Sequence, residues 1–351
     1  MAELDVERAA LLREGCVIPA HPLAIDEARR LDERRQRGLT RYYLASGAGG
    51  VAVGVHTTQF EIRDPRWGLL RPVLELAADV VRAEVGRPVL LVAGACGPTA
   101  QAVAEAELAA ELGYHAVLLG PGGLDGYSED ELVDRTAAVA EVLPVIGFYL
   151  QPAVGGRPLS AGYWRAVAEL PGVAAIKIAP FDRYATIDVV RSVCESSRRD
   201  EIALYTGNDD NILADLLTPF TVGVRGERVH KRIVGGLLGQ WAVWTRRAVE
   251  LLDRVRAAGH DPGELRALLG LAPALTDANA AIFDAAHGFH GCVPGIHEVL
   301  RRQGLLAGRW CLDPAGQLSP GQADEIDRVS REYPELTDDE FVAEHIEDWL
   351  R

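Results

Sequence analysis

The stretch VAAIKIAP, Val173 to Pro180, is the sixth of eight short apolar runs along this chain of 351 residues. The eight runs begin near Val17, Val51, Val89, Ala116, Val145, Ala174, Ile202 and Ile233. Their starts lie about thirty residues apart, the length of a strand, a helix and two short loops. Strands alternating with helices predict a parallel sheet, and eight such units predict an α/β fold, a (β/α)8 TIM barrel. A doubly wound open sheet is the alternative.

The pattern changes beyond about Gly259, where helical segments follow one another with no strand between them. We therefore expect the barrel to span residues 1–258 and a C-terminal helical extension to span residues 259–351. The segment 220–232, before the eighth run, is longer than a simple loop requires and is expected to form a hairpin of its own.

Composition excludes several classes of protein. The net charge of -15, with no basic stripe, opposes binding to nucleic acid. No apolar stretch approaches the roughly 20 residues that span a bilayer, and the amino terminus is charged rather than signal-like, so we expect a cytoplasmic protein without membrane contact. The five cysteines are scattered and odd in number, which is typical of reduced thiols.

Lys177 stands in the middle of the sixth apolar run, in a chain whose only other lysine is Lys231. Burying an ammonium group is costly, and the usual response is a lowered pKa and a neutral amine. A neutral, desolvated lysine is a nucleophile that forms Schiff bases with carbonyl compounds. The alternative is that Lys177 extends from the strand end towards water or pairs with a carboxylate.

Strand alternation predicts which side chains point into the barrel. On the sixth run, Lys177 is expected to point inward together with Ala175 and Ala179. On the fifth run, PVIGFYLQP, the same alternation predicts that Tyr149 points inward and Phe148 outward. Tyr149 would then lie one strand away from Lys177, within reach as a phenolic proton donor. Core packing with a satisfied hydroxyl is the alternative for Tyr149.

The second run, GVAVGVHTTQF, ends in Thr57 and Thr58. Two hydroxyls and adjacent backbone N–H groups at a strand end can hold a carboxylate. A turn-forming role is the alternative for this pair.

Taken in order, these motifs resemble the dihydrodipicolinate synthase and N-acetylneuraminate lyase superfamily of class I pyruvate-dependent aldolases. The resemblance spans roughly Val17 to Leu252. It implies that Thr57 and Thr58, in HTTQF against the family's G-T-T-G-E, bind the keto acid carboxylate. It further implies that Lys177, in IKIA, forms the Schiff base.

The resemblance also assigns the remaining site residues. Tyr149, in YLQP against Y-N-x-P, would shuttle protons. Asn208 or Asp209, in GNDD against a G-D-D-like ending of the seventh strand, would contact the distal part of the substrate. His56 has no counterpart in the resemblance; its residue type is consistent with orienting the substrate, with a hydrogen-bonded structural histidine as the alternative.

The chain also departs from the family pattern. His56, Gln59 and Phe60 replace the glycine, glycine and glutamate around the threonines, and GPGGLDGY replaces the P-Y-Y motif whose tyrosine crosses a subunit interface. AVGG follows Pro152 where dihydrodipicolinate synthases place an arginine, and Arg157 is nearby but out of register. These departures imply an enzyme other than dihydrodipicolinate synthase itself, with a wider entrance for a bulkier acceptor.

We therefore expect a Schiff-base-forming lyase or aldolase that acts on pyruvate or a pyruvate-ended 2-oxo acid, or a related dehydratase. We expect no cofactor. We also expect the protein to form a homo-oligomer, either a dimer or a tetramer. One alternative is a metal-dependent hydrolase, because AHGFHGCVPGIH concentrates four potential ligands: His287, His290, Cys292 and His297. A further alternative is a barrel that binds a keto acid without turning it over.

Overall fold

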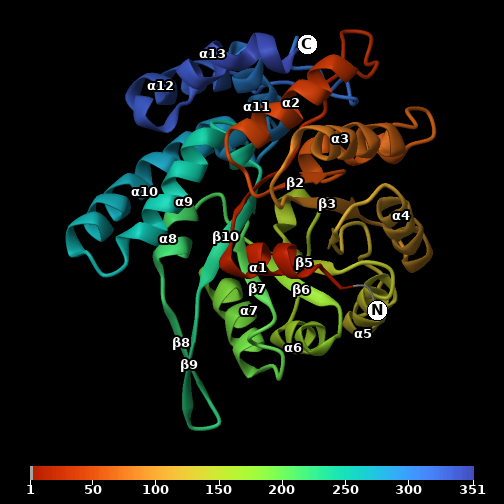
Figure 1. The fold of residues 1–351 in the computed structure, drawn as a ribbon, viewed down its shortest axis with the longest axis vertical. Coiled ribbons are helices and arrows are strands. Elements are labelled where there is room, and N and C mark those ends of the chain that lie inside the picture. Colours follow the sequence, from red (N-terminus) through yellow and green to blue (C-terminus); the bar gives the residue numbers. More distant parts are fainter. Residues whose placement is uncertain (1–2) are drawn as a thin grey trace. The chain divides into compact units, whose positions relative to one another are not determined.

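The computed structural model describes residues 3–351 and contains one eight-stranded sheet with helices around it (Figure 1). The strands pair in the order β1-β10-β7-β6-β5-β4-β3-β2. They span Val17–Pro19 (β1), Gly50–Val53 (β2), Leu90–Ala95 (β3), Ala116–Leu119 (β4), Val145–Leu150 (β5), Val173–Ala179 (β6), Ala203–Thr206 (β7) and Ile233–Leu238 (β10). Each strand begins within one residue of its predicted position.

The eight strands are parallel and form a nearly closed barrel. A parallel bridge between Ala20 and Ala52 joins the two strands at the ends of the sheet order, β1 and β2. The predicted (β/α)8 TIM barrel is therefore confirmed, and the open-sheet alternative is not needed.

The chain divides into two compact units. The central unit consists of the described residues up to Cys16 and of Leu90–Leu237, and the terminal unit consists of Val17–Val89 and Leu238–Arg351. Each unit contains both barrel strands and helices. The predicted boundary at residue 258 stays a prediction.

Side-chain caps fix the starts of several helices in the central unit. Its helices are α1 (Val6–Glu14), α4 (Thr99–Glu111), α5 (Glu129–Ala140), α6 (Ala161–Glu169), α7 (Arg183–Glu195) and α8 (Ile212–Leu217). Ser128 caps α5 in a reciprocal capping box with Glu131, Ser160 caps α6 and Asp182 caps α7. Because each cap accepts a hydrogen bond from an otherwise unpaired backbone N–H, these helices begin at defined residues after their loops.

The terminal unit contains the helices that were predicted beyond residue 259. Its helices are α2 (Glu33–Ala45), α3 (Leu70–Glu84), α9 (Thr245–Ala258), α10 (Pro262–Phe283), α11 (Cys292–Arg302), α12 (Gln322–Glu332) and α13 (Asp339–Trp349). Tyr42 of α2 anchors the last of them. Its hydroxyl donates to Asp338 at 2.8 Å, and its ring centroid lies 5.5 Å from that of Trp349.

The segment 220–232 forms the predicted hairpin. Strands β8 (Phe220–Val224) and β9 (Glu227–Lys231) pair antiparallel as a separate two-stranded sheet, which extends away from β7 and β10 in Figure 1. Across the pair, Thr221 Oγ1 lies 3.0 Å from His230 Nδ1.

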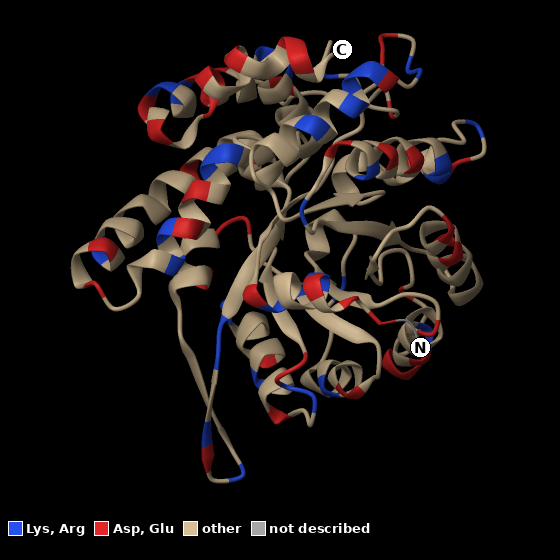
Figure 2. Cartoon of the chain, viewed as in Figure 1, with Lys and Arg blue, Asp and Glu red and all other residues tan. Residues whose placement is uncertain are grey.

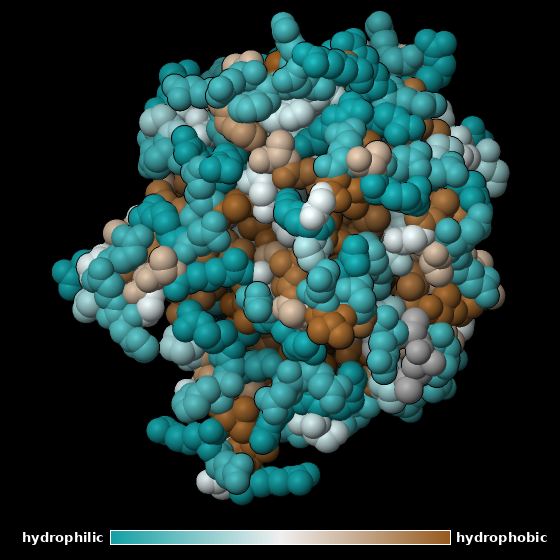
Figure 3. Space-filling model, viewed as in Figure 1, coloured by the Kyte–Doolittle hydropathy of each residue, from teal (hydrophilic) through white to brown (hydrophobic). Residues whose placement is uncertain are grey.

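Acidic and basic residues are spread over the outer helices (Figure 2), and the face shown in Figure 3 is mostly hydrophilic with apolar patches between. Among residues 3–351, the structure contains no helix with the length and apolar character of a membrane span.

Candidate active site

Lys177 lies in β6 and is 8% exposed. Its register partners on the neighbouring strands are Phe148 of β5 and Tyr205 of β7, and Nζ lies 4.2 Å from the centroid of the Phe148 ring. Burial lowers the pKa of Lys177 to about 8, and the Asp209 carboxylate opposes this shift. A useful fraction of the amine is therefore neutral near neutral pH, as nucleophilic attack requires.

Gly207, the first residue after β7, leaves room for the lysine side chain. A Cβ atom at this position would lie 2.5 Å from Lys177 Cε and 2.7 Å from Ala179 Cβ. The backbone there is fixed, since Gly207 N donates to Ile178 O at 2.7 Å. Any larger residue would displace Lys177 or the strand that carries it.

The predicted orientation of Tyr149 is wrong. Tyr149 pairs in register with Ile178, and Phe148 pairs with Lys177, so Phe148 is the residue that shares the face of the lysine. The Tyr149 ring packs against Trp164 of α6, with centroids 5.3 Å apart. Its hydroxyl accepts from Leu159 N at 3.3 Å and lies 3.5 Å from Leu159 O. These contacts match the alternative given for Tyr149, core packing with a hydrogen-bonded hydroxyl, rather than a proton donor that faces Lys177.

An irregularity in the pairing of β5 with β6 explains the error. Val145 pairs with Val173, but the next residue of β5, Ile146, pairs with Ala175, so Ala174 is an extra residue in β6. One extra residue moves all following side chains of one strand to the opposite face relative to its partner. The stretch VAAIKIAP contains no glycine or other marker of a bulge, so its residue types do not predict the extra residue.

The side chain of Asn208 is occupied by the protein itself. It is fully buried; Nδ2 donates to Asp215 at 2.9 Å and to Thr186 at 3.2 Å, and Oδ1 accepts from Phe181 N at 3.0 Å. These bonds tie the loop after β6 to α8. Asp209 is also buried, at 6% exposure, and acts electrostatically on Lys177. Of Asn208 and Asp209, the two residues predicted to contact the substrate, Asp209 is the one whose charge acts on Lys177.

In the terminal unit, the turn after β2 treats the two threonines differently. The Thr58 hydroxyl donates to His21 O at 2.7 Å and accepts from Gly54 N at 3.0 Å, so it holds the turn together. Thr57 Oγ1 is buried and has no hydrogen-bond partner among residues 3–351. The ring of His56 is partly exposed, with its centroid 6.1 Å from that of Phe60. The turn-forming role is therefore seen for Thr58, while the Thr57 hydroxyl is buried without a hydrogen-bond partner among the described residues.

The glycine-rich loop after β4 is held by Arg157. Arg157 Nη1 donates to Tyr127 O at 2.7 Å and to Leu124 O at 3.2 Å, which places this arginine in a structural role. A Cβ atom at Gly120 would lie 3.2 Å from Phe148 Cδ1. The space that a side chain would take at position 120 is therefore used by the ring that lies beside Lys177.

The four predicted metal ligands do not come together as a site. Within residues 3–351, no group of three or more His, Cys, Asp or Glu side chains is arranged to hold a metal ion. His287 Nδ1 lies 2.5 Å from Asp284 Oδ1, and His297 is fully buried in α11, where burial lowers its pKa to about 4. Cys292 is buried at the start of the same helix. The metal-dependent hydrolase alternative has no support in this geometry.

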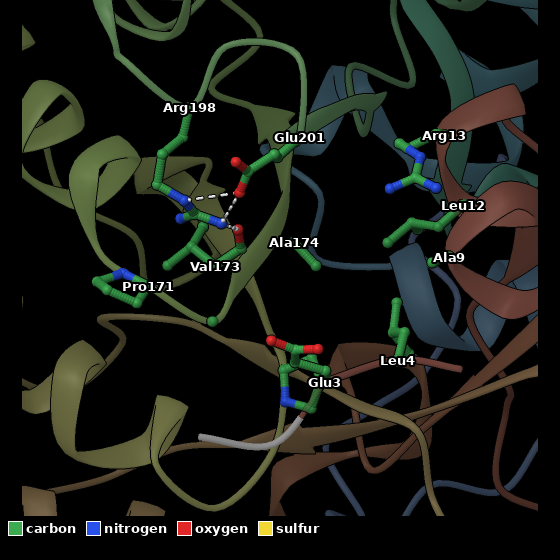
Figure 4. Close-up of a pocket in the computed structure, with 12 residues that line it drawn as sticks. Glu3, Leu4, Ala9, Leu12, Arg13, Pro171, Val173, Ala174, Arg198 and Glu201 are labelled. Atoms are coloured by element: carbon green, nitrogen blue, oxygen red, sulfur yellow. Dashed lines mark hydrogen bonds and ion pairs between the residues drawn. The ribbon is translucent and has the colours of Figure 1, made fainter. Parts of the chain in front are cut away.

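A cavity of about 330 Å³ lies at the beginning of β6, four residues before the lysine (Figure 4). Val173 lines it, together with the ion pair between Arg198 and Glu201 (3.0 Å) and with Arg13 of α1. No predicted site residue is among its lining residues. It lies at the end of the strand opposite to the carboxyl end, where the catalytic groups of such barrels gather.

Comparison with known proteins agrees with the fold. A model of the dihydrodipicolinate synthetase family matches residues 14–237, more than half of the chain. The chain belongs to this family. Membership of the dihydrodipicolinate synthetase family supports an enzyme of the class I aldolase and lyase kind.

Two relatives illustrate the range of the family. A 4-hydroxy-tetrahydrodipicolinate synthase from Bifidobacterium longum is 29% identical over 234 residues, which cover 66% of this chain and 72% of that protein. An N-acetylneuraminate lyase from Citrobacter koseri is 26% identical over 211 residues, which cover 59% of this chain and 67% of that protein.

Solved structures share the fold at low identity. Dihydrodipicolinate synthase from Bacillus anthracis superimposes with a TM-score of 0.73 at 20% identity, covering 92% of this chain and 99% of that chain. N-acetylneuraminate lyase from Fusobacterium nucleatum, solved in complex with pyruvate, gives a TM-score of 0.69 at 18% identity and covers 92% and 98%. At these identities the likeness concerns the fold alone.

Proposed function

We propose that this enzyme forms a Schiff base between Lys177 and pyruvate or a pyruvate-ended 2-oxo acid, and makes or breaks the carbon–carbon bond next to the imine. The observation that carries the proposal is the buried Lys177 amine, whose pKa is lowered to about 8 at the centre of a barrel strand. Both a synthase and a lyase are among the relatives, and one structural neighbour was solved with pyruvate.

The chemistry starts with attack of the neutral amine on the ketone carbon. The resulting carbinolamine loses water, and the imine nitrogen takes a proton. In the cleavage direction, the bond between C3 and C4 breaks, its electron pair flows into the protonated imine, and the C4 hydroxyl loses its proton as a carbonyl product forms. The enamine is then protonated at C3, and water releases pyruvate and the free lysine.

Asp209 is the group that we assign to proton transfer near the lysine. It is buried, and its charge acts on Lys177. Tyr149, in contrast, lies on the opposite face of β5 from the residue that pairs with Lys177. A carboxylate in this setting can accept the proton released as the imine forms or the bond breaks. The proton-relay role implied for Tyr149 by the family stays a prediction.

The carboxylate of the substrate is assigned to the turn after β2. The free hydroxyl of Thr57 and the backbone N–H groups of the turn are suitable donors, and Thr58 keeps the turn in shape. His56, partly exposed at the start of this turn, is assigned a role in orienting the substrate. Asn208 positions the loop after β6 rather than contacting the substrate.

Two observations limit which acceptor the enzyme uses. Arg157 holds the loop after β4, so no arginine is assigned to the second carboxylate that dihydrodipicolinate synthesis requires. Phe148 lies beside the lysine and presents an apolar ring where the predicted tyrosine was expected. We also propose that the protein is a homo-oligomer, a dimer or tetramer, as the family resemblance implies.

A panel assay tests the proposed function. Purified protein is incubated with sugar-derived and aromatic-aldehyde adducts of pyruvate, and pyruvate release is measured for the wild type, Lys177→Ala and Lys231→Ala. We expect at least one adduct to be cleaved, loss of activity in Lys177→Ala and normal activity in Lys231→Ala. Binding of 2-oxo acids without turnover of any adduct would favour the non-catalytic barrel instead.

A further inference from the structure

Asp215 of α8 is a buried carboxylate with a hydrogen-bond partner on every side. It is 1% exposed. Its Oδ2 accepts from Thr206 Oγ1 at 2.7 Å and from Asn208 Nδ2 at 2.9 Å. Its Oδ1 accepts from Asn211 Nδ2 at 3.1 Å and pairs with Arg183 Nη1. Both oxygens of the carboxylate are therefore engaged by groups of the protein itself.

Stability alone does not account for a carboxylate at this position. Removing a charge from water is unfavourable, and apolar residues of similar size often replace a buried ion pair without loss of stability. A buried polar network whose members are all hydrogen-bonded instead fixes the positions of those members. The effect of Asp215 is therefore to be sought in the segments that it holds in place.

The four donors to this carboxylate come from the ends of two neighbouring barrel strands. Thr206 is the last residue of β7, and Asn208 and Asn211 lie in the loop that follows it. Arg183 is the first residue of α7, after the loop that follows β6. Asn208 also accepts from Phe181 N at 3.0 Å, so its side chain bridges the two loops. The carboxylate thus joins the loop after β6 to the loop after β7.

The loop after β7 is the segment that lies against Lys177. A Cβ atom at Gly207 would lie 2.5 Å from Lys177 Cε, and the Asp209 carboxylate acts on the charge of Lys177. Asn208 is the residue between these two, and its backbone N–H donates to Thr206 Oγ1 at 3.1 Å. Any movement of Asn208 therefore moves both of its covalent neighbours relative to the lysine.

We propose that Asp215 is a positioning residue, which through Asn208 holds the loop after β7 against Lys177. The proposal rests on the proposed function in one respect, that Lys177 is the reacting amine. Within the described residues, the charge that acts on Lys177 is that of Asp209, so Asp215 acts through the loop rather than directly. Asp215 then decides how closely Asp209 and the lysine approach each other.

A double-mutant cycle separates this role from a contribution to stability alone. In the wild type, Asp209→Asn should lower the midpoint of the Lys177 titration, because a charge that stabilises the ammonium is removed. In the Asp215→Asn background the same change should have less than about half of that effect, since the loop no longer holds Asp209 in place. A merely structural Asp215 would lower the melting temperature and leave the effect of Asp209→Asn at full size. Tyr205 and Phe148, the register neighbours of Lys177, stay in every variant.

The midpoint is measured by NMR on protein that is isotope-labelled at Cε of lysine. The spectrum is simple because Lys177 and Lys231 are the only two lysines in the chain. Lys231 is the internal reference: burial lowers its pKa, and Cys194 and Asp200, which both raise it, are unchanged in these variants. Its midpoint should therefore be the same throughout the cycle.

Two further variants make the test independent of how well Asp215→Asn folds. Thr206→Val keeps the shape of the side chain and removes its bonds to the carboxylate and to the neighbouring amide, so it should also reduce the effect of Asp209→Asn. Ser196→Ala is the matched control. It removes a buried hydrogen bond to Ala168 O, 3.0 Å long, at the C-terminal end of α7, and should leave that effect unchanged. Thermal unfolding checks that each variant is folded.

The titration does not require imine formation, so the positioning role and the proposed function fail separately. If the wild type traps no 2-oxo acid but the effect of Asp209→Asn shrinks in Asp215→Asn and in Thr206→Val, the Schiff-base function fails and the positioning role stands. If the effect of Asp209→Asn is the same size in all backgrounds, the positioning role is overturned, whether or not an adduct forms on Lys177.

Discussion

A lysine becomes a nucleophile when its surroundings favour the neutral amine over the ammonium. Around Lys177, some features lower the pKa of the amine and others raise it. Burial lowers the pKa of Lys177, and the Asp209 carboxylate raises it, which together give about 8. The ring of Phe148, 4.2 Å from Nζ, favours the charged form as a cation–π partner. Lys177 therefore gains or loses its proton within the physiological pH range.

This balance predicts the pH dependence of imine formation. The rate with pyruvate should rise by roughly tenfold per pH unit below the pKa and level off above about pH 8, because only the neutral amine attacks. In Asp209→Asn the midpoint should move to lower pH, since a charge that stabilises the ammonium is removed. Asp200→Asn is the control, because Asp200 acts on Lys231 instead. A midpoint that stays in place or rises in Asp209→Asn would contradict this account.

Gly207 gives a steric prediction at the same scale. Gly207→Ala places a Cβ atom 2.5 Å from Lys177 Cε, so the lysine must shift, and trapping should slow on the order of 10²-fold. Gly223→Ala in the hairpin is the matched control, because nothing lies within 4 Å of its added Cβ. Equal trapping rates in the two variants would show that the lysine has more freedom than the structure indicates.

At the scale of elements, one extra residue in β6 decides which side chains surround the lysine. The bulge at Ala174 places Phe148 beside Lys177 and turns Tyr149 towards α6. The glycine at position 120 fits this arrangement, since a Cβ atom there would lie 3.2 Å from the Phe148 ring. The bulge in β6 and the glycine in the loop after β4 therefore both accommodate the ring of Phe148 beside Lys177.

Tyr149→Phe tests the orientation of β5. The variant loses the hydroxyl that accepts from Leu159 N, so the free energy of unfolding should fall by about 1 kcal/mol in urea titrations. Turnover should stay within about threefold of the wild type, because the hydroxyl lies on the far side of the strand. A proton-relay role would instead cost roughly 10² to 10⁴ in rate. A loss of that size in a folded variant would restore the family role of Tyr149.

At the scale of the whole molecule, a Schiff-base mechanism and a metal-dependent hydrolase differ in what they need from solution. The His287 to His297 segment forms no metal-binding group within the described residues, and His297 is buried in α11. Dialysis against EDTA should therefore leave turnover within about 20% of the untreated enzyme, since an imine needs no Lewis acid. Activity that is lost on dialysis and regained with zinc would require a different site.

The sequence was sufficient for the barrel and for the lysine, but not for the site around it. Eight apolar runs located the strands because burial on both faces leaves a direct mark on composition. Lys177 was recognisable because a lysine in such a run is unusual. Side-chain partners leave no such mark: neither the bulge at Ala174 nor the internal bonds of Asn208 could be inferred from residue types.

The central claim, that Lys177 carries the substrate as an imine, has one direct measurement. The wild type is reduced with borohydride in the presence of pyruvate and other 2-oxo acids, and the modified peptide is identified by mass spectrometry. With only two lysines in the chain, the assignment is unambiguous. We predict a single reduced adduct on Lys177, which is lost in Lys177→Ala and retained in Lys231→Arg. An adduct on Lys231, or no adduct with any 2-oxo acid, would contradict the account.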